Sequence, residues 1–162
     1  MSHNTQHWIR AINLAKVDGG QIVPTAIYYD DNRRHHIGRK AIDRCNNPER
    51  LIDDFKIELG ENNPDAVTKR TARAGTPRNT VVGIAQDYFN SFLNQVNEWL
   101  ENEGRPLPKN IIVAEPLALS GSNMEDEGWL SNYRRSLLRI LKNKFDNVDF
   151  LPEPFAVFQY YR

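Results

Sequence analysis

Two short apolar segments on either side of an amphipathic helix constrain the fold of this chain most strongly. Residues 110–114 and 148–151 have the length and apolar content of short buried strands, and the segment from about Glu125 to Phe145 repeats apolar residues at helical spacing. Parallel strands need a long crossover connection, usually a helix, whereas antiparallel strands can be joined by a short hairpin turn. A helix between two short strands therefore favours a parallel pair. The sequence therefore predicts a βαβ unit whose first strand, 110–114, is buried on both faces.

A long amphipathic helix precedes the predicted βαβ unit. Thr76-Pro77 has the form of a helix cap followed by proline, and the helix is predicted to continue to about Glu103. Apolar side chains within 81–100 recur on one face, whereas asparagine and acidic side chains occupy the opposite face. With a last helix from Glu153, residues 76–162 are predicted as helix–strand–helix–strand–helix.

The first part of the chain, 8–75, predicts a β-meander followed by a helix. The segment 22–29 is rich in β-branched and aromatic residues, and a turn after it allows 33–37 to return as a partner strand. Asn47-Pro48-Glu49 combines an Asn cap, a proline and an acid, so it is predicted to open a helix that ends at Gly60.

Length, charge and cysteine content exclude several classes of protein. The chain has 162 residues, 21 basic and 21 acidic, so its formal net charge is zero, whereas a dedicated nucleic-acid binder carries a basic excess. A single cysteine, Cys45, excludes a disulfide framework and a four-thiolate zinc site. No apolar run approaches the roughly 18 residues that span a bilayer, and the polar N-terminus lacks the apolar region of a secretory signal. We therefore expect a cytoplasmic protein that contacts neither nucleic acid nor membrane.

One domain is expected over most of the chain. Residues 1–7 are polar and are expected to be a disordered or expression-derived tail. Residues 8–162 are expected to form one α/β unit, with the β-meander and first helix in 8–75 and the long helix and βαβ unit in 76–162. Because two parallel strands make a very small sheet, this sheet is predicted to be incomplete.

Three stretches in collinear order resemble the nucleotide-binding domain of the seventy-kilodalton heat-shock chaperones of the DnaK type, within the actin-like ATPase superfamily. The first joins Ile22-Val23-Pro24-Thr25-Ala26-Ile27-Tyr28-Tyr29 to His36-Ile37-Gly38-Arg39-Lys40-Ala41, and the second joins Asn47-Pro48 to Asp54-Phe55-Lys56-Ile57-Glu58-Leu59-Gly60. The third joins Ile111-Ile112-Val113-Ala114-Glu115-Pro116, through a basic helix, to Leu151-Pro152-Glu153-Pro154-Phe155-Ala156. The resemblance extends over about residues 8–161.

The resemblance implies a partial ribonuclease-H-like lobe and a Mg-ATP site in the full-length parent protein. Lys56 matches the family's catalytic lysine, which faces the terminal phosphate, and Glu153 matches the carboxylate that binds the hydration shell of magnesium. Pro116, with Arg134 or Arg135, resembles the proline–arginine relay that couples nucleotide state to lobe movement. An ammonium group suits phosphoryl transfer because that reaction is accelerated mainly by positioning and charge stabilisation.

The sequence departs from the family where the phosphates are held. Nothing before Trp8 resembles the family's first glycine-rich loop, the chain ends where the second would follow, and Phe155 stands where the family usually has threonine. The resemblance therefore implies an internal piece of the first lobe that does not turn over ATP alone and needs no cofactor by itself. Its expected partners are the remainder of its own ATPase domain and, for the parent, co-chaperones or client proteins.

Other interpretations stay open on the residues alone. Lys56 has the spacing of a solvated lysine on an amphipathic helix, and Glu153 that of an acid stabilised by a helix N-terminus. The chain would then be a non-catalytic interaction module, its incomplete sheet completed by a partner or by a second copy in a homodimer. A third interpretation is a small hydrolase in which Glu115 and Glu153 act as acid and base, which requires pKa values that differ between the two.

Overall fold

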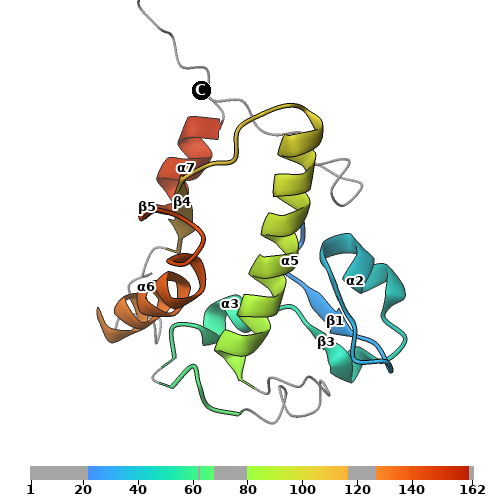
Figure 1. Cartoon of the computed structure of the whole chain (residues 1–162). Helices are drawn as coiled ribbons and strands as arrows, with labels where there is room; N and C mark the ends of the chain where they lie inside the picture. Colours follow the sequence, from blue (N-terminus) through green and yellow to red (C-terminus); the bar gives the residue numbers. More distant parts are fainter. Residues whose placement is uncertain (1–21, 62, 68–79, 117–126, 161–162) are drawn as a thin grey trace, which may run out of the picture.

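A long helix separates two small sheets in this mixed α/β structure. The computed structural model describes residues 22–61, 63–67, 80–116 and 127–160. Helix α5 (Val81–Asn102) runs through the middle, with the antiparallel sheet and α2 (Gly38–Arg44) on one side and the parallel sheet on the other (Figure 1). No helix within the described ranges has both the length and the apolar character needed to cross a membrane.

The antiparallel sheet has the strand order β2-β1-β3. Strands β1 (Ile27–Tyr29) and β2 (His35–Ile37) form the predicted hairpin, and β1 also pairs with β3 (Leu51–Ile52). The carboxylate of Asp30 closes the turn by accepting hydrogen bonds from the backbone N–H groups of Asn32 and Arg34, both at 2.9 Å. The hydrogen bond from Arg34 is the main reason that the pKa of Asp30 lies below its ordinary value.

The continuous helix predicted between Asn47 and Gly60 is wrong. The structure has a 3-10 turn at Pro48–Arg50, then strand β3, then the one-turn helix α3 (Phe55–Glu58). The Asn47 side chain caps the 3-10 turn, and backbone pairing of Leu51 and Ile52 with β1 then holds the chain extended. Tertiary pairing thus overrides a local helical pattern, as propensity alone permits.

Helix α5 begins later than the sequence predicts. The side-chain oxygen of Thr80 accepts a hydrogen bond from the backbone N–H of Gly83 at 3.1 Å, which satisfies one of the free donors at the helix start. The predicted cap Thr76-Pro77 lies outside the described residues. The predicted apolar face is confirmed, since Val81, Ala85 and Tyr88 are buried.

The predicted βαβ unit is confirmed. Strands β4 (Asn110–Glu115) and β5 (Asn147–Pro152) pair in parallel and are joined through α6 (Glu127–Leu141), and α7 (Glu153–Tyr160) follows β5 directly. Burial of β4 on both faces is wrong, because Ile112 is 65% exposed. Ile111 and Val113 point instead to the core under α5 and α6, so one face of the strand is packed.

Trp129 of α6 packs closely against Gly60, just after α3. A Cβ atom added at Gly60 would lie 2.0 Å from the indole atom Cε2 of Trp129, far inside van der Waals contact. The indole N–H donates to the backbone carbonyl of Ile57 at 3.2 Å, and the ring stacks on Tyr133. Glycine at position 60 therefore allows α6 to approach α3.

Replacing Gly60 by alanine should destabilise the fold. We expect Gly60→Ala to lower the free energy of unfolding in urea by about 2–3 kcal/mol, because the methyl group displaces a buried indole. The matched control is Gly104→Ala, where no atom lies within 4 Å and only the backbone conformation at φ +65° opposes the substitution, at about 1 kcal/mol. Equal losses for the two variants would contradict the close contact.

Candidate functional site

Lys56 and Glu153 meet although 97 residues separate them in the sequence. The Lys56 ammonium group donates to the Glu153 carboxylate in an ion pair, and the two side chains are 37% and 42% exposed. Lys56 lies on α3, and Glu153 is the first residue of α7, directly after β5. The fold thus brings together two of the residues that the sequence singles out.

The one-turn helix that carries Lys56 is fixed by side chains of α6. Three carbonyls at and beyond its C-terminal end accept hydrogen bonds: Ile57 from the Trp129 indole, Leu59 from the Ser136 hydroxyl at 3.1 Å and Gly60 from the Asn132 amide at 3.4 Å. A four-residue helix leaves most of its carbonyls without internal partners, so these external donors stabilise it. Phe55 anchors the other side in the core.

Glu115 lies at the carboxyl end of the parallel strands, as Glu153 does. Glu115 is the last residue of β4 and lies in register with Pro152, the residue before Glu153. The carboxyl ends of parallel strands are the usual place for ligand-binding groups in open α/β sheets. Pro116 follows Glu115 and is half-buried at this edge.

Arg134, and not Arg135, pairs with Glu115. The guanidinium donates two hydrogen bonds to the carboxylate, from Nε to Oε2 at 2.7 Å and from Nη2 to Oε1 at 2.5 Å. Glu115 is only 2% exposed, so this bidentate contact compensates a buried charge, and the hydrogen bonds to Glu115 raise the pKa of Arg134. Arg135 is exposed on α6. The pair ties the Glu115-Pro116 end of β4 to α6.

Tyr133 lies near Glu153 and Glu115 and belongs to the same site. It was not singled out from the sequence, because it is one of several residues on the apolar face of a helix. Its side chain is buried, and burial, followed by the negative charges of Glu153 and Glu115, raises the pKa of its phenol. The phenol is therefore a neutral hydroxyl close to both carboxylates. The only sequence signal for it was its position next to Arg134 on the helix that returns to this edge.

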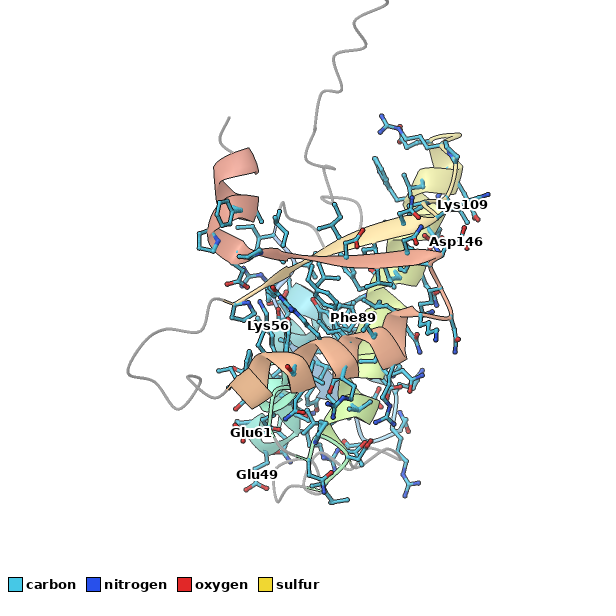
Figure 2. All side chains as sticks on the ribbon, turned by 90° about the vertical axis from the view of Figure 1, so that its left-hand side faces the viewer. Glu49, Lys56, Glu61, Phe89, Lys109 and Asp146 are labelled. Atoms are coloured by element: carbon cyan, nitrogen blue, oxygen red, sulfur yellow. The ribbon has the colours of Figure 1, made fainter. Side chains whose placement is uncertain are left out.

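A cavity of about 170 Å³ lies beside the ion pair and is mostly apolar. It is lined by Thr25, Phe55, Lys56, Leu59, Tyr88, Phe89, Phe92, Val113, Ala114 and Tyr133. In Figure 2, Lys56 of α3 and Phe89 of α5 are seen behind the β4–β5 strands and α6. Apolar walls lower the local dielectric, so the charge of Lys56 acts more strongly here than on an open surface.

The arrangement does not favour acid–base chemistry between the two carboxylates. Glu153 contacts Lys56 and Glu115 contacts Arg134, so each carboxylate has its own cation. An acid–base pair needs surroundings that make the two carboxyl groups different in protonation.

No protein-family model, curated protein or solved structure matches this chain.

The Glu115–Arg134 pair should contribute to stability through the buried carboxylate. We expect Arg134→Met to lower the free energy of unfolding in urea by about 2–3 kcal/mol, less than for a fully buried pair because Arg134 is 46% exposed.

Two comparisons make this prediction specific. Arg135→Met, the neighbouring change at an exposed position, should alter stability by less than about 0.5 kcal/mol. Adding Glu115→Gln to Arg134→Met should recover part of the loss, since the uncompensated charge is removed. A loss in the double variant as large as the sum of the two single losses would contradict the pairing.

Proposed function

We propose that this chain forms part of the nucleotide-binding lobe of a cytoplasmic actin-like ATPase of the heat-shock chaperone type, with a ribonuclease-H-like arrangement of its parallel strands. The observation that carries the proposal is the contact of Lys56 with Glu153 at the carboxyl edge of β5. The sequence resemblance implies that these two residues belong to one site for phosphate and magnesium.

Lys56 would act on the terminal phosphate by position and charge. Its ammonium group has three donor hydrogens, so it can remain near Glu153 while it contacts a phosphate oxygen and orients the attacking water. Its attachment to a helix fixed by α6 limits the movement of the charge. Such preorganised charge lowers the barrier to phosphoryl transfer because little rearrangement accompanies the reaction.

Glu153 fits magnesium held through its own water molecules. Magnesium prefers oxygen ligands, releases water reluctantly and is commonly bound by one or two carboxylates together with substrate phosphates. Within the described part of the chain no group of three metal-ligating side chains occurs, and Glu153 offers one half-exposed carboxylate. When bound, the ion would neutralise charge on the phosphates, while Glu153 would orient its hydration shell.

We propose that the 162 residues alone do not turn over ATP. Sites of this chemistry hold the triphosphate with glycine-rich loops whose backbone N–H groups face the phosphates. The only adjacent glycines in the sequence, Gly19-Gly20, lie outside the described residues. The remainder of the ATPase domain would supply these loops.

A second candidate is an interaction module completed at the parallel sheet. Within the described ranges β4 pairs with β5 alone, and Ile112 and Phe155 are 65% and 61% exposed. A partner strand or a second copy could pair with the free edge of β4. This candidate assigns no role to the contact between Lys56 and Glu153, so we rank it second.

Removing the Lys56 ammonium group should separate catalysis from binding. In the complete gene product, Lys56→Ala should lower the ATP turnover rate by about 10²–10³-fold, the usual effect of removing one preorganised electrostatic group. The dissociation constant for ATP, measured by calorimetry, should change by less than about fivefold, because the phosphates and the base are bound mainly by other parts of the domain.

Lys142→Ala is the matched control, since Lys142 is an exposed lysine just after α6. It should change neither turnover nor affinity. Equal losses of turnover and affinity in Lys56→Ala would assign Lys56 a structural role. ATP hydrolysis by the 162-residue chain alone would contradict the proposed dependence on further loops.

A further inference from the structure

A second cavity, of about 130 Å³, lies on the side of α5 that faces the antiparallel sheet. We call it the β2–α5 pocket. It is lined by His35, His36, Ile37, Lys40, Ser91 and Gln95, which come from β2, α2 and α5. Five of these residues are polar and none is acidic. These lining residues belong to other elements than Lys56 of α3 and Glu153 of α7. They take no part in the function proposed above.

His35 is held at the pocket by contacts on two sides. Its Nε2 atom lies 2.7 Å from the hydroxyl oxygen of Ser91, and its ring packs against Tyr29 at 5.9 Å between centroids. The Tyr29 hydroxyl in turn donates to Asp87 of α5 at 3.0 Å. The imidazole is therefore positioned by β1 and α5 together, and it is not a solvated turn residue.

His36 has a separate environment. Its ring stacks on Tyr28, and its Nε2 atom lies 3.5 Å from the carboxylate of Asp30. Because the backbone N–H groups of Arg34 and Asn32 stabilise the charged form of Asp30, this carboxylate can also stabilise a protonated His36. Asp30 is not among the residues that line the pocket.

We propose that the β2–α5 pocket binds the phosphate group of a small phosphate monoester. The ammonium of Lys40, the hydroxyl of Ser91 and the two imidazoles are able to donate hydrogen bonds. The Gln95 amide donates one hydrogen to the Ser91 backbone carbonyl at 3.3 Å and has a second hydrogen to donate. Hydrogen bonds from charged donors to phosphate are among the strongest in proteins. An anion would meet no negative side chain in the lining.

The size of the pocket limits what it can hold. Its volume corresponds to roughly four water molecules, which is enough for one tetrahedral oxyanion. Pockets for whole drug-sized ligands measure about 300–1,000 Å³. A phosphate group would therefore fill the pocket, and the rest of the ligand would lie outside it.

The hydrogen bond between His35 and Ser91 determines whether the Ser91 hydroxyl can donate to an anion. When a neutral His35 accepts a hydrogen bond at Nε2 from the Ser91 hydroxyl, that O–H cannot donate to an anion. A protonated His35 donates from Nε2 to the Ser91 oxygen instead, which leaves the Ser91 O–H free to donate to the anion. The protonated ring also adds positive charge beside Lys40, while Tyr29, Asp87 and Asp30 lie behind the two histidines.

The test uses nuclear magnetic resonance on the isotopically labelled whole chain. Inorganic phosphate is titrated at constant ionic strength, and saturable shifts are expected for the amides of residues 35–40, Ser91 and Gln95. Lys40→Met and Ser91→Ala should each weaken binding by about tenfold, the usual effect of losing one charge-assisted hydrogen bond. Lys142→Met should have no effect. The amide spectrum of each variant shows whether it is folded.

Sulfate serves as the second probe, because it remains a dianion throughout the pH range in which the charge of inorganic phosphate changes. Saturable shifts are expected for the same amides as with phosphate. His35→Gln should weaken sulfate binding, because it removes the imidazole that lies against the Ser91 hydroxyl.

Several results would overturn the proposal. Absence of saturable shifts, or shifts unchanged in Lys40→Met, would exclude an anion site in this pocket. Sulfate binding that is unchanged in His35→Gln would exclude a role of His35 in the site. Tighter binding of a phosphoserine peptide than of glycerol phosphate would overturn the assignment to a small ligand.

Discussion

Packing against α5 is the interaction on which the rest of this structure depends. The two sheets share no strand among the described residues, so backbone hydrogen bonds do not set their relative position. Tyr88 of α5 packs on Phe55 of α3 and donates through its hydroxyl to the backbone carbonyl of Pro24 at 3.2 Å, while the same helix contacts α6. The contact between Lys56 and Glu153 is therefore a consequence of side-chain packing around one helix, α5, which runs between the two sheets (Figure 1).

The two polar sites lie on different sides of this helix and have different origins. The contact between Lys56 and Glu153 joins α3 to the start of α7 and depends on α6, whose side chains donate to carbonyls in α3 and just after it. The β2–α5 pocket instead depends on the polar positions Ser91 and Gln95 of α5, which face β2. An apolar stripe and a polar stripe on one helix thus position two separate groups of charged side chains.

The periodicity of apolar residues predicted the long helix and the two strands that flank the crossover helix. The long helix and the parallel strands of the βαβ unit follow from spacing, because their apolar patterns match what the packing requires. The helix between Asn47 and Gly60 could not be predicted correctly, since pairing of Leu51 and Ile52 with β1 decides that segment. Exposure of Ile112 was also missed, because a short apolar run does not show which of its faces will be covered.

The contacts of the candidate site could not be predicted from the spacing of residues. Spacing alone gives Lys56 and Glu153 no reason to meet, and Tyr133 and the His35–Ser91 contact depend on how separate elements pack. Arg134 and Arg135 were equivalent in the sequence, and only the direction of each side chain on α6 distinguishes them.

A double-mutant cycle on Lys56 and Glu153 tests the central claim most directly. Unfolding free energies would be measured in urea at low salt for the unchanged chain, Lys56→Met, Glu153→Gln and the double variant. The account predicts a favourable coupling of about 0.5–1 kcal/mol, suited to a half-exposed pair and reduced by added salt. Additive losses, with a coupling near zero at low salt, would show that the packing around α5 does not bring these two residues together.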